Sequence, residues 1–244
     1  MTALHLEKVT KVYRKGENEV RALDGIDIDI EKGEFLAVVG PSGSGKTTFL
    51  NILGCLDSPT DGRIVYDGTE LRGLGEKGMS AYRRDRISFV FQSYNLIPVL
   101  TVRENVELPL LIERKLGAAE IRRRAAEMIA AVGLSGMENR YPRELSGGQE
   151  QRVAIARALV KQPLVILADE PTANLDSRTA QEIVDLMHGI NAEKGSTFVF
   201  STHDRLVMEH ARRVVTICDG RVTSDEQKNP PAAAQKNPPS AAGK

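Results

Sequence analysis

The sequence predicts an α/β fold in which a mainly parallel sheet is flanked by helices. The first observation behind this prediction is a set of five short runs, rich in Val, Ile and Phe, along the 244-residue chain. The runs are apolar throughout, which is typical of strands buried on both faces, as in a parallel sheet covered by helices. They are Phe35–Val39, Ile87–Phe91, Leu164–Ala168, Thr197–Phe200 and Val214–Cys218.

The second observation is that helical patterns lie between these runs. One amphipathic helix is expected behind Asp176 or Ser177 as its N-cap. Its apolar residues follow the i, i+3, i+4, i+7 spacing: Ile183, Leu186, Met187 and Ile190. The arginines 122–124 lie opposite another apolar stripe and are interpreted as a solvated helix face. That stripe consists of Ile121, Ala125, Met128, Ile129 and Val132.

Two further segments predict subdomains around the sheet. Leu4–Val9 and Arg63–Gly68 have the pattern of half-exposed strands and are expected to form an N-terminal antiparallel sheet at one side. The region from about 93 to 161 carries helix patterns but no good strand. We therefore expect a helical subdomain inserted into the α/β core.

The composition changes after Val222, which sets the predicted domain boundary. We expect a folded domain over 1–222 and a disordered Pro/Ala-rich tail over 223–244. The tail repeats Gln-Lys-Asn-Pro-Pro at 227–231 and 235–239. Such a segment buries too little apolar surface to offset the entropy lost on ordering. The sequence leaves open whether the tail is a tether or an incidental extension.

The composition also excludes several classes of function. Thirty-three basic and 33 acidic residues give no net charge, and Trp is absent, so we expect no nucleic-acid partner. Cys55 and Cys218 are too few and too far apart for a disulfide framework or zinc site. No signal peptide or membrane-spanning run is evident. If the chain works at a membrane, it must dock onto a protein that spans it.

The strongest local motif is a complete P-loop. It follows the buried run 35–39 and precedes a helix-compatible stretch, Thr48–Leu53. Its glycines let backbone N–H groups turn toward phosphates, Lys46 reaches the β- and γ-phosphates, and the Thr47 hydroxyl ligates Mg²⁺. The predicted ATP-binding residues here are Gly40, Pro41, Ser42, Gly43, Ser44, Gly45, Lys46, Thr47 and Thr48.

An acidic pair ends the third buried run. Asp169 stands where a carboxylate faces the metal at the edge of a sheet, and Glu170 is adjacent to it. The alternative is that the pair caps the next helix. Pro171 follows at once and Thr172 is the better cap, which favours a catalytic interpretation.

A second glycine-rich helix start lies between these motifs. Leu145, Ser146, Gly147, Gly148 and Gln149 precede the helix-like stretch 150–160, and the serine hydroxyl and glycine amides suit an anion. A plain serine-capped helix is the alternative. A simple nucleotide-binding domain has no use for a second such loop, so the pair suggests a site completed by another copy of the chain.

Together these motifs resemble the ATP-binding cassette (ABC) ATPases, from about Leu4 to Val222. The resemblance implies that Glu170 orients or deprotonates the attacking water. It also implies that residues 145–149, the signature loop, face the γ-phosphate held by the opposite subunit of a head-to-tail homodimer. ATP and Mg²⁺ are the implied ligands, with Thr47 and Asp169 toward the metal.

Further positions match the family in the same way. Gln92 corresponds to the glutamine that senses Mg²⁺ and water, and His203 to the histidine that contacts the γ-phosphate. With Glu170 they are the implied catalytic set. The loop 174–176 matches the one that crosses the dimer interface. Tyr13 matches an aromatic residue that stacks on adenine; an ordinary edge-strand tyrosine is the alternative.

Three missing features and the similarity of one segment indicate the branch of the family. The sequence lacks a guanine-specifying motif, an inserted coiled coil and a second cassette, which leaves a nucleotide-binding subunit of a transporter. Residues 91–98 and 101–106 resemble the lipoprotein-release and macrolide-export branch. This implies an integral membrane permease that docks near Gln92–Thr101, at the cytoplasmic face of the inner (plasma) membrane. The alternatives are a cell-division-type cassette that regulates cell-wall hydrolases and a cytosolic ATPase without a membrane partner.

Overall fold

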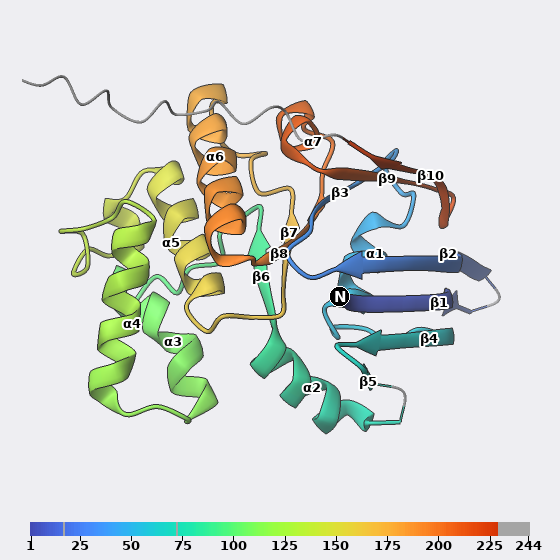
Figure 1. The fold of residues 1–244 in the computed structure, drawn as a ribbon, viewed down its shortest axis with the longest axis horizontal. Coiled ribbons are helices and arrows are strands. Elements are labelled where there is room, and N and C mark those ends of the chain that lie inside the picture. The colour runs from blue at the N-terminus through green and yellow to red at the C-terminus, as the bar shows by residue number, and fades with distance from the viewer. Residues whose placement is uncertain (17, 72, 229–244) are drawn as a thin grey trace, which may run out of the picture.

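The computed structural model describes residues 1–16, 18–71 and 73–228, and a six-stranded sheet forms its centre (Figure 1). The strands are β3 (Phe35–Val39), β6 (Ile87–Phe91), β7 (Val165–Asp169), β8 (Thr197–Ser201), β9 (Arg213–Cys218) and β10 (Arg221–Gln227). They lie in the order β10-β9-β3-β8-β7-β6, and all neighbours are parallel except β10 and β9. The five buried runs match β3 and β6–β9 to within one residue, which confirms the mainly parallel α/β sheet.

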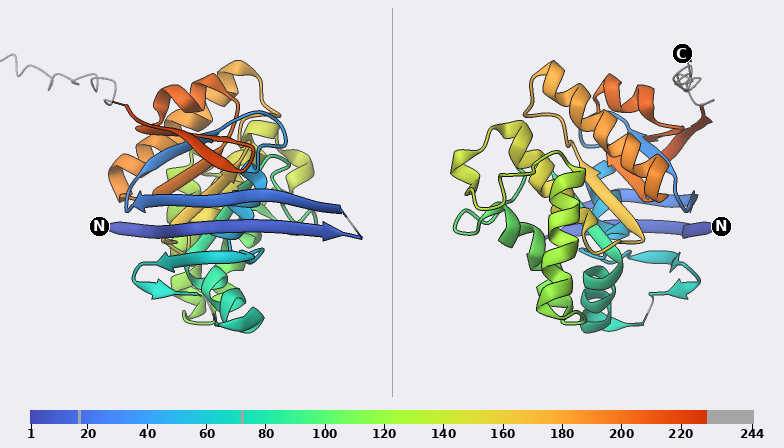
Figure 2. Two further views of the ribbon diagram at one scale, coloured as in Figure 1. Left: turned by 90° about the vertical axis from the view of Figure 1, so that its right-hand side faces the viewer. Right: turned by 60° about the vertical axis from the view of Figure 1, so that its left-hand side comes forward.

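An antiparallel sheet lies beside this centre, as the N-terminal pattern predicts. Its order is β2-β1-β4-β5, with β1 and β2 as long neighbouring strands (Figure 2, left). The strands are β1 (Thr2–Lys15), β2 (Asn18–Glu31), β4 (Asp61–Tyr66) and β5 (Thr69–Glu70). Strand β2 was not predicted, although its second half carries the alternation of a half-buried strand, with Ile26, Ile28 and Ile30 buried.

The two faces of the parallel sheet are covered differently. Phe35 and Ala37 of β3 point into a core formed with α5 (Gly147–Leu159), α6 (Ser177–Lys194) and α7 (Arg205–His210). Leu36 and Val38 point the other way, into a core shared with α1 (Lys46–Leu53) and the antiparallel sheet. Because every second residue serves each core, β3 is apolar at all positions, which is why it reads as an unbroken run.

The helical region predicted at 93–161 lies to one side of the sheets (Figure 1). It contains α3 (Val102–Glu113), α4 (Ala118–Ala131), a short 3₁₀ turn (Pro142–Glu144) and α5, and none of its residues, all described, is in a strand. The predicted α4 stripe is buried, while Arg123 pairs with Glu120 and Glu127 on the outer face. The helix α2 (Gly75–Arg86) was not predicted, because none of its residues is buried.

The C-terminal boundary of the fold lies later than the sequence predicts. Strand β10 continues to Gln227, so a disordered tail beginning at 223 is wrong for its first residues. Arg213 of β9 holds this strand through two hydrogen bonds of 2.6 Å to Asp225, and it also pairs with Glu34 at 3.1 Å. Residues 229–244 of the predicted tail lie outside the described residues. Among the described residues, no helix has both the length and the apolar character needed to cross a bilayer.

Candidate nucleotide site

The order of the parallel strands brings four predicted motifs to one edge of the sheet. The P-loop 40–47 follows β3, His203 follows β8 by two residues, Glu170 follows β7 and Gln92 follows β6. In the sheet these strands are consecutive neighbours, β3-β8-β7-β6. Their carboxyl ends therefore meet at one edge, which is where open α/β sheets bind ligands.

Two glycines of the P-loop are required by its geometry. Gly40 has a φ of 150°, and a Cβ there would lie 2.0 Å from the Ile217 carbonyl oxygen. Gly45 has a φ of 107°, and its Cβ would lie 2.4 Å from the Ala22 carbonyl oxygen. Gly45 is also the N-cap of α1 and offers no side-chain cap, so the first N–H groups of that helix are available to an anion.

The loop carries donors that suit a phosphate. The Lys46 ammonium donates to the carbonyl oxygens of Gly40 (2.8 Å) and Pro41 (2.9 Å), and thus lies across the loop. The Ser44 hydroxyl is buried and finds no hydrogen-bond partner among the described residues. A buried donor without an acceptor is costly unless a ligand completes it. The loop, residues 20–22 and the 219–220 turn line a hollow of about 310 Å³.

The acidic pair lies beside the switch histidine. The Glu170 Oε1 is 2.7 Å from His203 Nδ1, and its Oε2 accepts a hydrogen bond from the Thr202 hydroxyl at 3.2 Å. Glu170 also has a φ of 46°, a backbone conformation that clusters at functional sites in non-glycine residues. Burial raises the pKa of the Asp169 carboxyl, and the charge of Glu170 adds to this, while the Ser201 hydroxyl opposes it. The two carboxylates thus have different environments.

The helix that follows the acidic pair, α6, begins directly behind Asp176, one of its two predicted N-caps. Asp176 caps α6 by accepting from the N–H groups of Arg178 and Thr179, which confirms it as the N-cap. The prediction that Thr172 caps the helix is wrong: its hydroxyl donates to Asp204 at 2.6 Å. Since α6 begins seven residues after Glu170, the acidic pair does not cap it either.

Gln92 lies on the same edge but is held by another loop. Its Nε2 donates to the Asn174 Oδ1 at 3.3 Å, and the Asn174 Nδ2 donates to the Gln92 carbonyl at 3.0 Å. Phe91, the residue before it, pairs with Asp169 across β6 and β7. The glutamine predicted to sense the metal and the loop predicted to cross the dimer interface are therefore joined within one subunit.

The signature loop starts α5 and lies apart from the P-loop hollow. Ser146 caps the helix by accepting from the Gln149 N–H at 3.4 Å, and the Gln149 Oε1 accepts from the Ser146 N–H at 2.9 Å. A Cβ on Gly147 would lie 3.1 Å from the Tyr94 hydroxyl, and one on Gly148 only 2.4 Å from the Thr179 methyl carbon. The glycines thus also permit close packing. None of residues 145–149, all described, lines the hollow.

Tyr13 lies in the last part of β1, which pairs there with β2 but not with β4. Its hydroxyl donates to Asp57 at 2.8 Å, and the Lys11 ammonium lies 4.9 Å from the ring centroid. The ring remains 41% exposed. These contacts fix its orientation without covering it, and they are compatible with both a stacking residue and an ordinary edge-strand tyrosine.

Two buried polar residues belong to this region but were missed in the sequence. Gln151 of α5 is fully buried and donates to the Pro171 carbonyl at 2.6 Å, one residue after Glu170. Asn105 of α3 is fully buried and makes four hydrogen bonds to the backbone of Ile97, Leu100 and Thr101. A polar residue on the apolar face of a helix is the signal that marks both.

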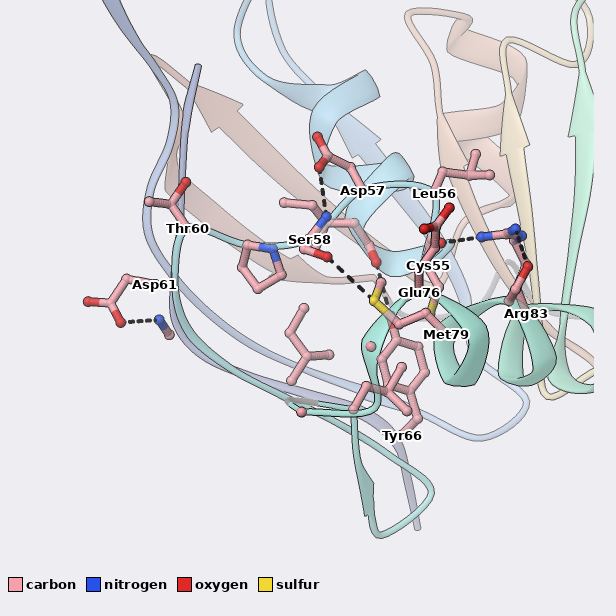
Figure 3. A pocket seen from close by; sticks show the side chains of 18 residues that line it. Cys55, Leu56, Asp57, Ser58, Thr60, Asp61, Tyr66, Glu76, Met79 and Arg83 are labelled. Carbon is pink, nitrogen blue, oxygen red and sulfur yellow. Dashed lines mark hydrogen bonds between the residues drawn. The ribbon is translucent and has the colours of Figure 1, made fainter. Parts of the chain in front are cut away.

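A larger hollow of about 690 Å³ lies elsewhere, between the end of α1, β4 and α2 (Figure 3). It is lined by apolar side chains such as Leu56, Tyr66 and Met79, with Arg83 bonded to the Cys55 carbonyl and to Ser80. None of the predicted site residues lines it. Of the predicted site residues, those of the P-loop from Gly43 to Thr48 line the smaller hollow instead.

Comparison with known families decides the identity of this arrangement. A family model described as "ABC transporter" matches residues 23–173. The chain belongs to the ABC transporter family. Its P-loop and the Asp169–Glu170 pair both fall within the matched segment, and it is an ATPase cassette of that family.

The cassette is similar to proteins from several organisms. It is 46% identical to an ABC transporter ATP-binding protein of Methanocaldococcus jannaschii, MJ0796, over 92% of this chain and 97% of that protein. It is 44% identical to the lipoprotein-releasing system ATP-binding protein LolD of Bordetella avium, over 90% of this chain and 95% of that protein. It is 46% identical to the macrolide export ATP-binding/permease protein MacB of Hyphomonas neptunium, over 94% of this chain and 35% of that longer protein.

The similarity extends to solved structures. A dimeric post-hydrolysis structure of MJ0796 bound to ADP and Pi matches with a TM-score of 0.84 at 45% identity, over 93% of this chain and 99% of that chain. CbiO1 of Clostridium perfringens matches with the same TM-score at 31% identity. The ABC cassette fold expected from the sequence is confirmed.

Proposed function

We propose that two copies of this cassette close head to tail around two ATP–Mg²⁺ and use the cycle of closure and hydrolysis to drive a membrane permease. One observation carries the proposal. The P-loop and the signature loop each begin a helix whose first N–H groups have no partner within that helix, yet the signature loop does not line the P-loop hollow. A second copy, turned so that its signature loop faces the first P-loop, brings the two sets together around one nucleotide.

Each residue of the composite site has a distinct role in this proposal. Lys46, the P-loop amides and the Ser44 hydroxyl bind the phosphates, and Tyr13 packs on the adenine. Thr47, Asp169 and Gln92 are the residues that would hold Mg²⁺, and the ion would offset the negative charge of the phosphates there. Among the described residues, no group of three His, Cys, Asp or Glu lies close enough together to hold a metal ion.

The hydrolytic step is assigned to Glu170 and His203. Glu170 orients the attacking water and accepts its proton. The 2.7 Å contact between Glu170 Oε1 and His203 Nδ1 supports a role for His203 in holding this carboxylate, and the contact with the γ-phosphate is assigned to the same histidine. From the opposite subunit, Ser146, Gly147 and Gly148 donate to the same phosphate. Because these donors arrive only on closure, hydrolysis is coupled to dimer formation.

The partner is proposed to be a permease of the lipoprotein-release or macrolide-export type, with the cassette peripheral at the cytoplasmic face of the membrane. The similarity to LolD and MacB supports this assignment. Docking is assigned to residues 93–101, the docking segment, which follows Gln92. Val99 is its most exposed apolar side chain, at 78%, whereas Leu96 packs against the helical core. The docking contact is therefore expected at Val99 rather than at Leu96.

The experiment that tests the composite site is Glu170→Gln. The substitution keeps the size of the side chain but removes the base, so hydrolysis should fall by about 10²–10⁴-fold while ATP still binds. Size-exclusion chromatography with ATP–Mg²⁺ should then show a stable mutant dimer that the wild type occupies only transiently.

Glu182→Gln on the exposed face of α6 is the matched control, and it should behave as the wild type. A Glu170→Gln protein that hydrolyses ATP at the normal rate would exclude this carboxylate as the base. One that stays monomeric at saturating ATP would contradict the head-to-tail dimer.

A further inference from the structure

One arginine joins the docking segment to α5, the helix that begins at the signature loop. Arg157 of α5 donates from Nη1 to the Asn95 carbonyl at 2.6 Å and from Nη2 to the Tyr94 carbonyl at 2.7 Å. Tyr94 and Asn95 are consecutive residues with φ of 58° and 50°, in the left-handed region. Such a pair of non-glycine residues persists only where the surroundings hold it. The two hydrogen bonds from Arg157 stabilise this backbone conformation.

The Tyr94 side chain then returns to the signature loop. Its hydroxyl lies 3.1 Å from the position of a Cβ on Gly147, and the ring carbon that bears it lies 3.9 Å away. Burial, with a smaller contribution from the Glu150 carboxylate in the first turn of α5, raises the pKa of the Tyr94 phenol. The tyrosine therefore packs on the start of the helix whose other end region carries Arg157.

The far end of the docking segment is fixed as well. The Asn105 side chain accepts from the Ile97 N–H at 2.9 Å and donates to the carbonyls of Ile97, Leu100 and Thr101. The segment is thus clamped to α3 at one end and to α5 at the other. Because both ends are held by hydrogen bonds, a movement of the docking segment should also move α3 and α5.

We propose that Arg157 and Tyr94 are positioning residues through which the docking segment sets the position of the signature loop. The inference rests on the proposed function, in which Ser146–Gly148 act on the nucleotide of the opposite subunit. Arginine is required because its planar fork presents two donors to two adjacent carbonyls, whereas a lysine ammonium lacks this geometry. A partner that moves the docking segment thereby moves the loop that completes the second subunit's site.

The test separates turnover from nucleotide binding in the isolated, full-length protein. Arg157→Lys should lower kcat about 10-fold, which corresponds to about 1.4 kcal/mol, while the KM for ATP and monomer ATP affinity stay within about twofold. Tyr94→Ala should give the same split, and Tyr94→Phe should recover most of the lost kcat because the ring still packs on α5. Arg152→Lys, on the same helix, is the matched control, since Arg152 donates to the Val132 carbonyl and not to the docking segment.

Unchanged ATP affinity of the variants verifies that they are folded. A lower kcat with an unchanged KM then supports the positioning role of Arg157 and Tyr94. It is overturned if Arg157→Lys leaves kcat unchanged, if it lowers kcat no more than Arg152→Lys does, or if Tyr94→Phe is as impaired as Tyr94→Ala. Failure of Glu170→Gln to dimerise is a separate result that contradicts the proposed function. The two failures are therefore distinguishable.

Discussion

The nucleotide edge of the sheet and the helical region α3–α5 are built on different principles. At the edge, each functional group belongs to a short motif at the end of a strand, and the strand order brings the motifs together. In the helical region, the important contacts join residues far apart in the chain, such as Arg157 and Tyr94 or Gln151 and Pro171. The residues of a catalytic site can therefore be close together in the sequence, while the contacts that couple the site to the rest of the protein are not.

Ser146→Arg is expected to give the largest difference between loss of turnover and loss of ATP binding. The bulky side chain blocks the signature loop, so turnover should fall by about 10²–10³-fold, as when one preorganised donor to a charged transition state is removed. ATP binding to the monomer should remain near normal, because the P-loop hollow contains no signature residue. Equal losses of binding and turnover would contradict a site shared between subunits; nucleotide titration alongside steady-state kinetics measures both.

Gly45→Ala should give the opposite pattern, with binding itself lost. A Cβ at this position meets the Ala22 carbonyl, and the φ of 107° is strained for alanine, so the loop must shift. We expect ATP affinity to fall about 100-fold, equivalent to about 2.7 kcal/mol. Gly117→Ala, which has open space around its Cβ and an ordinary φ, is the control. Normal ATP binding by Gly45→Ala in a calorimetric titration would show that this loop does not bind the phosphates.

The smallest effect is expected at the docking segment. Val99→Asp places a charge on its most exposed apolar side chain, so stimulation of ATP hydrolysis by a reconstituted permease should fall several-fold, as for loss of one apolar contact of about 1 kcal/mol. The measured quantity is the ratio of stimulated to unstimulated rate in the same variant. Leu74→Asp, an exposed apolar residue before α2, serves as the control. An unchanged ratio for Val99→Asp would place the docking surface elsewhere.

The sequence predicted most of the nucleotide edge because buried strands and phosphate loops restrict every residue within them. The predicted bounds Phe35–Val39 are those of β3, because both faces of that strand are covered. Two P-loop glycines, Gly40 and Gly45, are required because a Cβ there would clash with the backbone. The roles assigned to Glu170, His203, Gln92 and Tyr13 stay predictions, although the first two lie in contact.

The contacts of the helical region could not be predicted from the sequence, for a physical reason. Arg157, Gln151 and Asn105 all bond to backbone carbonyls, and any residue can supply a carbonyl. The identity of the residue that supplies the carbonyl therefore gives no signal in the sequence. In addition, an arginine on a helix is usually a surface residue. The helix α2 was missed for a related reason, since a helix without buried residues has no apolar period to detect.

The pairing of Arg213 with Asp225 has a practical consequence for where the protein can be shortened. A cut at residue 222, where the composition changes, removes Asp225 and leaves the Arg213 guanidinium, whose side chain is 10% exposed, with Glu34 as its remaining carboxylate. Loss of two charge-assisted hydrogen bonds should destabilise the fold by about 2–3 kcal/mol, and a thermal melt should show it. A cut after Lys228 keeps the whole edge strand and should leave the melting temperature unchanged; equal melting of the two shortened chains would show that Asp225 contributes nothing to stability.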